Sequence, residues 1–306
     1  MRENIPVIRL RTDTDRLVTR DGVVLCFFMR RSHSEVASTV WRALQTYLRA
    51  VPPTALSWYG SDDGDTLPLD DKGWEVIRKQ MLERPGGIAR IVELEEDASA
   101  VGGYHFEYYG RNLAEPMFSH DEDSTTGVLF TLPTEYLLEQ GPARVCALAL
   151  ELARELPFSF GYASLAFVAP HGLWYAARRE LNGLLARYLG FDLYNLGDTS
   201  RAIGTRARGA YWLTFLGQPL LGQLGGIEGL RDKLSFSEVS LQPLEGERLL
   251  ISLGEWPDAI DTSKEVYLPQ YRALAHLLEP FLYEERTGWF SQDKENMRRW
   301  LRRLCQ

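Results

Sequence analysis

The stretch Asp21-Gly22-Val23-Val24-Leu25-Cys26-Phe27-Phe28-Met29 decides the expected fold. Seven consecutive apolar residues follow an Asp-Gly turn signal, which predicts a buried strand. A helix is expected directly after it, from a cap at Ser34 to about Ala50, with one apolar face made by Val36, Val40, Leu44 and Tyr47. The run Val51-Pro52-Pro53 ends this helix, since proline cannot continue it.

Strands and amphipathic helices alternate along the rest of the chain. In the first half, the pattern predicts strands at 57–59, 88–94 and 104–109 and a second helix at 74–82. In the second half, it predicts strands at 127–132 and 158–168 and helices at 140–156 and 174–189, with Pro142 in the first turn of its helix. The last third adds strands at 237–241 and 248–253 and helices at 227–234, 268–278 and 290–304.

Both halves therefore have the order strand, helix, strand, helix. The predicted class is α+β (mixed α/β), with two similar halves packed as one compact unit and with extra C-terminal strands and helices. We expect an N-terminal α/β lobe with acidic loops at residues 1–115 and a C-terminal α/β lobe at 116–306. One continuous domain fits the same pattern.

Composition indicates a globular protein. Of the 306 residues, 45% are apolar and 11% aromatic, which excludes disorder as the general state. The formal charge of −8 disfavours nucleic acid as a partner, because contacts with phosphate need a basic surface. The cysteines Cys26, Cys146 and Cys305 are too widely spaced for a disulfide framework or a zinc motif, and the first two are expected to be buried thiols. No signal peptide or long apolar span is found, so we expect a cytoplasmic protein without membrane contact.

The negative charge is concentrated in one part of the chain. Residues 60–125 carry 16 acidic and 6 basic side chains, a balance of −10, whereas the rest of the chain carries 26 acidic and 28 basic groups, a balance of +2. The carboxylates cluster in three expected loops, at 62–71, 93–97 and 121–123.

Known catalytic motifs do not fit the sequence. Counting from Asp63 or Asp121 places the wrong residues at the Gly and Glu positions of an EF-hand, which leaves only a looser calcium site for these loops. The glycines at 217 and 222 have P-loop spacing, but Gln223 and Leu224 replace the required Lys and Ser/Thr. A nuclease centre made from Asp65 and the segment 70–72 would precede a helix instead of lying on core strands. The sequence therefore predicts no enzyme, no cofactor, and no catalytic or metal-binding residue.

The acidic loops and their aromatic neighbours indicate a surface for a basic protein. Charges raise the association rate, while a few aromatic side chains supply most of the affinity. The residues predicted to bind the partner are Trp58, Tyr59, Asp62, Asp63, Asp65, Asp70, Asp71, Glu95, Glu96, Asp97, Asp121, Glu122 and Asp123. The alternative is that the loops only keep the protein soluble and that the aromatics are core residues at strand ends.

Several short segments resemble one bacterial family. They are Gly22 to Phe28, Tyr47-Leu48, 188–192, 209–216, 224–226, Gly254-Glu255-Trp256-Pro257-Asp258-Ala259-Ile260-Asp261, 268–274 and 278–280. Together they cover about residues 20 to 285. They resemble the type VI secretion immunity proteins that accompany nuclease effectors with a restriction-endonuclease fold. The resemblance implies a non-enzymatic antitoxin that binds a cognate nuclease and protects the producing bacterium.

Inhibition by tight protein–protein binding is therefore the leading hypothesis. A nuclease groove must attract a polyanion, so an acidic loop could occupy it as a phosphate mimic, or the protein could bind elsewhere and disrupt effector assembly. We expect a monomer that binds its effector directly. The alternatives are a hydrolase or small-molecule-binding enzyme whose site has no sequence motif, and an adaptor for the secretion apparatus.

Overall fold

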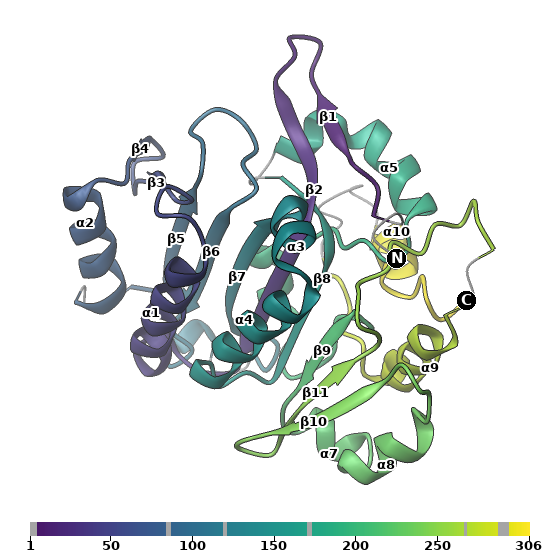
Figure 1. Cartoon of the computed structure of the whole chain (residues 1–306). Coiled ribbons are helices and arrows are strands. Elements are labelled where there is room, and N and C mark those ends of the chain that lie inside the picture. The colour runs from purple at the N-terminus through teal and green to yellow at the C-terminus, as the bar shows by residue number, and fades with distance from the viewer. Residues whose placement is uncertain (1–4, 84–86, 119–120, 170–172, 266–267, 287–293) are drawn as a thin grey trace.

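The chain forms one large antiparallel sheet (Figure 1). The computed structural model describes residues 5–83, 87–118, 121–169, 173–265, 268–286 and 294–306. Eleven strands follow the order β10-β11-β9-β8-β2-β7-β6-β5-β3-β4, with β1 added beside β2. The strands are β1 (Arg9–Arg11), β2 (Leu17–Met29), β3 (Trp58–Gly60), β4 (Thr66–Pro68), β5 (Ala89–Glu95), β6 (His105–Arg111), β7 (Thr126–Pro133), β8 (Phe160–Val168), β9 (Leu213–Leu216), β10 (Ser240–Leu244) and β11 (Arg248–Ser252).

The apolar stretch at 21–29 lies in the middle of this sheet. β2 pairs with β7 on one side and with β8 on the other. Its side chains alternate between two cores: Val23, Leu25, Phe27 and Met29 enter one, whereas Val24, Cys26 and Phe28 enter the other. Gly22 is needed for this close pairing, because a Cβ atom there would lie 2.6 Å from Val168 Cγ2 and 2.9 Å from the Leu132 carbonyl oxygen.

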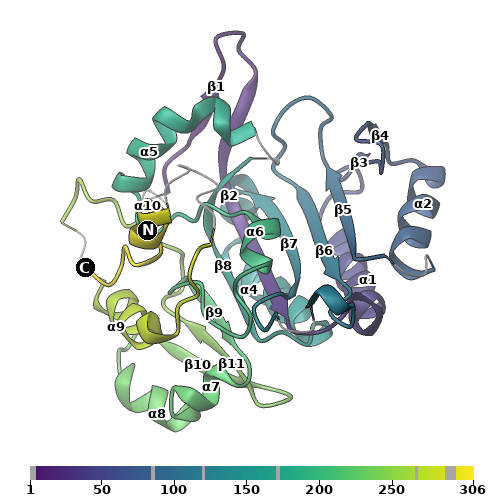
Figure 2. The same cartoon turned by 180° about the vertical axis from the view of Figure 1, so that it is seen from behind.

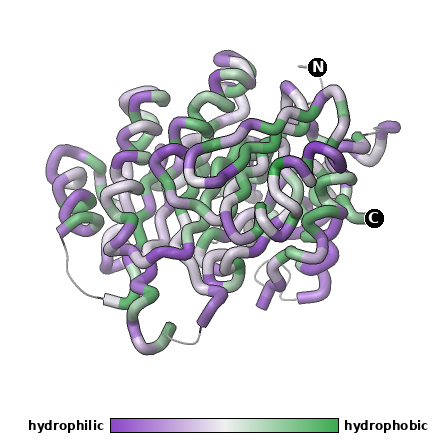
Figure 3. The backbone as a smooth tube through the Cα atoms, turned by 90° about the horizontal axis from the view of Figure 1, so that it is seen from below, coloured by the Kyte–Doolittle hydropathy of each residue, from purple (hydrophilic) through white to green (hydrophobic). Residues whose placement is uncertain are grey.

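Helices cover both faces of the sheet. Figure 1 shows α1, α3 and α4 in front of the strands, and Figure 2 shows α6 on the opposite side. The helices are α1 (His33–Ala50), α2 (Asp71–Leu82), α3 (Thr134–Gln140), α4 (Pro142–Glu155), α5 (Arg178–Arg187), α6 (Leu196–Ser200), α7 (Leu220–Gln223), α8 (Gly226–Lys233), α9 (Pro269–Leu278) and α10 (Lys294–Leu301). Short 3₁₀ turns lie at Pro116–Phe118, Leu173–Ala177 and Glu279–Phe281. In Figure 3 the hydrophobic segments run through the middle of the molecule, and hydrophilic ones gather in the outer loops.

The predicted α+β class and compact packing are confirmed. α1 lies against the core on one face through residues such as Val40 and Leu44, and it ends before Pro52 as predicted. Its cap is Ser32 and not Ser34, because the capping box joins Ser32 to Glu35 and starts the helix at His33. The Glu35 carboxylate accepts a hydrogen bond from the Ser32 backbone N–H at 2.7 Å.

Other boundaries also differ from the sequence prediction. The helix expected at 140–156 is two helices, α3 and α4, because Gly141 separates them with a left-handed φ of 81°. α4 starts at Pro142, as expected. The helix expected at 174–189 begins as a 3₁₀ turn and continues as α5 only from Arg178 to Arg187.

The C-terminal third shows two further differences. The predicted start of the strand at 237–241 is wrong by three residues, because β10 begins at Ser240. A turn precedes this strand, in which the Val239 N–H donates a hydrogen bond to the Phe236 carbonyl at 3.1 Å. α10 is shorter than the expected helix at 290–304, and residues 290–293 lie outside the described part of the chain.

The sheet continues across residue 115. β6 and β7 are hydrogen-bonded neighbours, and β2 lies between two strands from the second half of the chain. Cys26 is buried, as predicted, whereas Cys146 of α4 is only half-buried, because it packs against the border of the core. None of the helices within the described ranges combines the length and hydropathy of a bilayer-spanning segment.

Candidate functional site

One edge of the sheet carries most of the predicted partner-binding residues. It consists of β3, β4, α2 and β5, residues 58–95 with a gap at 84–86, and we call it the acidic edge. β4 is the last strand of the sheet, and all three of its residues are exposed. α2 lies beside this strand at the side of the molecule (Figure 1).

The loop between β3 and β4 presents Asp62, Asp63 and Asp65 to solvent. A tight turn fixes the loop: the Ser61 N–H donates to the Asp65 carbonyl at 2.8 Å, and Gly64 adopts a left-handed φ of 87°. Gln80 of α2 donates a hydrogen bond to Asp62 Oδ1 at 3.2 Å. The loop is therefore held against α2 while its carboxylates stay accessible.

A groove of about 420 Å³ lies between this loop and α2. Tyr59 and Gly60 line one side, and Val76, Lys79 and Gln80 line the other. Asp62 also lines it. The groove thus combines apolar groups with charged and polar ones.

Exposed apolar side chains gather on the same edge. Among the described residues, eight large apolar side chains are exposed, and five of them lie on the acidic edge: Leu67, Val76, Leu82, Ile88 and Ile91. Their exposed fractions run from 39% to 53%. Exposed apolar groups that cluster beside charges are typical of a surface that binds another protein.

Asp70 and Asp71 stand at the start of α2 but have different roles. Asp70 is the N-cap, and its Oδ1 accepts hydrogen bonds from the backbone N–H groups of Lys72 and Gly73 at 3.0 and 2.9 Å. The sequence pattern predicted that this helix begins at Trp74. It begins at Asp71 instead, because Asp70 caps it. Asp71 is exposed in the first turn.

The two aromatic residues of β3 point to opposite faces of the sheet. Tyr59 is buried, and its ring lies against Gly73 of α2. Trp58 is half-buried, and its cross-strand partner is Glu95. Successive strand residues alternate between faces, so only Trp58 lies on the side that carries Glu95.

The carboxylates at 95–97 lie where β5 turns toward β6. Glu95 is half-buried, and burial raises its pKa. Glu96 Oε2 accepts hydrogen bonds from the Gly103 and Tyr104 N–H groups at 2.7 and 3.3 Å, which fixes the loop. Asp97 Oδ1 accepts from the Ser99 and Ala100 N–H groups, and these bonds lower its pKa although burial opposes the shift.

The third acidic loop lies at the opposite end of β6. Asp121 Oδ1 accepts hydrogen bonds from the Asp123 and Ser124 N–H groups at 2.9 and 3.1 Å. Asp123 forms ion pairs with Arg206, at 2.5 Å, and with Arg286. Glu122 is exposed. The structure therefore separates this loop from 95–97 and surrounds it with arginines.

A cluster that the sequence pattern did not predict lies on the sheet face next to Trp58. His105 and Glu107 of β6 are buried, with 3.8 Å between Nε2 and Oε2, and Glu93 and Glu95 face them from β5. Burial opposes protonation of His105, but the hydrogen bond and the charge of Glu107, with those of Glu95 and Glu93, raise its pKa. The alternation of apolar and acidic residues at Val92, Glu93, Leu94 and Glu95 was the available signal in the sequence.

The fold is similar to that of one solved structure. The solved structure titled "Pseudomonas aeruginosa T6SS protein PA0821" superposes with a TM-score of 0.77 over 98% of this chain and 87% of that chain, at 20% sequence identity. No match was found among curated proteins. At this identity, the likeness establishes the architecture alone.

The sequence identifies the family. The model of the TsiV family, described as type VI immunity for VRR-NUC, matches residues 39–304, and the chain belongs to this family. The predicted resemblance is therefore confirmed, and so is the predicted function: this is a type VI immunity protein for a VRR-NUC nuclease effector.

Proposed function

We propose that the acidic edge binds the VRR-NUC nuclease and covers its nucleic-acid groove. The observation that carries this proposal is the meeting of an exposed acidic loop, a groove and five exposed apolar side chains on one edge of the sheet. Of the thirteen predicted residues, we place Trp58, Asp62, Asp63, Asp65 and Asp71 in the contact.

The chemistry of the target favours this surface. A nuclease must attract a polyanion, so the walls of its groove carry basic side chains. Exposed carboxylates at 62–65 would attract that groove at long range and raise the association rate. The apolar side chains beside them would supply affinity once water is excluded.

Five of the other eight predicted residues have a structural role within the chain. Asp70 caps α2, Glu96 and Asp97 bind backbone N–H groups, Asp123 pairs with two arginines, and Tyr59 is buried. These contacts supply a structural reason for each residue type. We therefore propose that these five stabilise the fold and do not contact the effector directly.

We further propose a monomeric, non-enzymatic inhibitor that acts in the cytoplasm and binds no nucleic acid. A hydrolase would need a cavity with convergent acid and base groups. A cavity of about 970 Å³ beside α5 and α10 is large enough for a small molecule. Among the described residues that line this cavity are Arg178, Arg272, Arg299 and Arg303, but no Asp, Glu, His or Cys. These residues therefore offer no acid–base pair.

Charge reversal tests the proposed interface. The triple variant Asp62→Lys, Asp63→Lys, Asp65→Lys should slow association with the purified nuclease domain at least tenfold at low salt and should abolish rescue when the two proteins are co-expressed. The matched control is Asp232→Lys, Glu238→Lys, Glu255→Lys, which changes the charge equally at exposed positions outside the acidic edge.

The two outcomes separate the interface from net charge. If both triple variants lose binding equally, overall charge and not the acidic edge controls association. If the first variant folds and still binds and protects like the natural protein, the loop at 62–65 is not the contact.

A further inference from the structure

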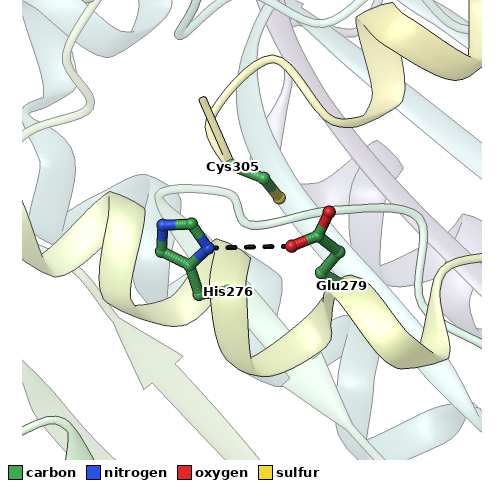
Figure 4. Close-up of side chains that lie close together, drawn as sticks. All are labelled: His276, Glu279 and Cys305. Atoms are coloured by element: carbon green, nitrogen blue, oxygen red, sulfur yellow. Dashed lines mark ion pairs between the residues drawn. The ribbon is translucent and has the colours of Figure 1, made fainter.

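Three metal-ligating side chains of different chemistry lie together at the C-terminal end of the fold (Figure 4). His276 of α9 and Glu279 of the following 3₁₀ turn are three residues apart and share one helical face. Cys305 reaches the same place from the segment after α10. The ligand atoms of the three residues all lie within 4.8 Å of one another, and His276 Nδ1 is 3.7 Å from Glu279 Oε2.

This spacing is close to what one tetrahedral ion requires. Zinc bonds to N, O and S are roughly 2.0 to 2.3 Å long, so its ligand atoms lie about 3.3 to 3.7 Å apart. His276 is exposed, and Glu279 and Cys305 are half-buried, so their side chains have room to rotate and close the remaining difference, which is at most about 1 to 1.5 Å. Three protein ligands leave a fourth position for water.

The ligand types select the metal. A thiolate and an imidazole exclude calcium and magnesium, which prefer oxygen ligands, and favour a borderline-soft ion such as Zn²⁺. The second Glu279 oxygen, Oε1, lies 4.0 Å from Arg302 Nε, so that the carboxylate is oriented with Oε2 toward His276. Such outer contacts are what position ligands at metal sites.

We propose that His276, Glu279 and Cys305 bind one Zn²⁺ ion and that this ion ties the C-terminal segment to α9. The same two segments already meet where Arg272 donates a hydrogen bond to the Gln306 carbonyl at 2.8 Å. On binding, the Cys305 thiol gives up its proton to solvent, and the new Zn–S bond replaces the S–H bond. The site lies outside the acidic edge, so this proposal does not rest on the proposed function.

The first test uses the full chain, reduced and freed of metal with a chelator. Titration with ZnCl₂ in a calorimeter should show one ion per chain, and zinc at a hundredfold excess over Kd should raise Tm by about 5 °C. His276→Ala and Cys305→Ser should each weaken binding at least tenfold. Cys146→Ser, which removes the half-buried thiol of α4, should bind zinc like the natural protein.

Circular dichroism of the metal-free proteins verifies that each variant is folded before titration. The proposal is overturned if the natural protein binds no zinc, or if His276→Ala and Cys305→Ser bind it unchanged. Light scattering with and without zinc provides the second measurement. If zinc produces a dimer that depends on Cys305, the ion bridges two chains, and the proposed link within one chain is wrong.

Discussion

Arg208 donates a hydrogen bond to Asp192 in the interior of the protein, and the two side chains are only 1% and 0% exposed. Each of the two charged groups also has another hydrogen-bond partner. Tyr162 donates its hydroxyl to Asp192 Oδ2 at 2.7 Å, and Arg208 donates to the Leu193 carbonyl at 2.6 Å. Tyr162 belongs to β8, and the backbone of Asp192 is hydrogen-bonded to the same strand. Arg208 follows Ala207, which lies in the second core, so this ion pair joins the sheet to the segment that carries Arg208.

Removing one charge of this pair should strongly destabilise the fold. We expect Asp192→Asn to lower the free energy of unfolding by about 3 to 5 kcal/mol, because Arg208 would remain buried without its counter-ion. Urea denaturation measures the change. The double variant Asp192→Leu, Arg208→Met should lose less stability than Asp192→Asn. A single variant with unchanged stability would mean that solvent reaches the pair.

Val76 should anchor the effector. It lines the groove beside the 62–65 loop and is 48% exposed, so Val76→Lys removes apolar contact without disturbing the core. We expect at least a tenfold faster dissociation of the nuclease complex and an unchanged Tm. Surface plasmon resonance measures the rates. Val7→Lys, at a position 77% exposed outside the acidic edge, is the control and should leave dissociation unchanged.

Asp70 should contribute to stability and not to binding. Asp70→Ala removes the cap of α2 and should lower the free energy of unfolding by about 1 kcal/mol. Asp71→Ala, one residue further on, should change stability by only a few tenths of a kcal/mol, because its carboxylate interacts with the helix dipole alone. Thermal unfolding compares the two. Equal losses would contradict a specific capping role for Asp70.

His105 should make stability depend on pH. Its pKa is raised in the folded protein, so the stability it contributes is complete below the ordinary histidine value of about 6.5 and is lost as pH rises through the raised pKa. The natural protein should therefore lose more stability between pH 6 and pH 9 than His105→Gln does. Denaturant unfolding at the two pH values measures this difference.

His33 provides a control of opposite sign. Burial, with the nearby charge of Arg90, lowers its pKa, so its neutral form stabilises the fold and stability falls as pH drops below about 6.5. His33→Gln should make the protein less sensitive to acid. Should both variants change the pH dependence in the same direction, the assigned causes would be wrong.

Local patterns in the sequence were sufficient to predict the central elements of the fold. The apolar run at 23–29 has the composition of a strand, and the apolar face from Val36 to Tyr47 has helical spacing, so β2 and α1 could be predicted. The break at Gly141 was missed, because a helix stop at a single glycine depends on a left-handed φ that composition alone does not show.

The candidate surface was less predictable. The loop at 62–65 and its exposure followed from charge and turn residues, but the roles of other carboxylates depended on distant partners. Asp123 meets Arg206 and Arg286, which are 83 and 163 positions away. The sequence alone could not show which of Trp58 and Tyr59 faces the core. That depends on the register in which β3 pairs with β5.

The position of β2 between β7 and β8 has a consequence for the timing of protection. A ribosome makes residues 17–29 early, but the second neighbour of this strand ends at Val168. One side of this strongly apolar strand therefore stays unpaired until more than half of the protein has been synthesised. A truncated chain that ends before β8 would leave one side of the central strand open, so the smallest unit that confers immunity must extend well beyond the acidic edge itself.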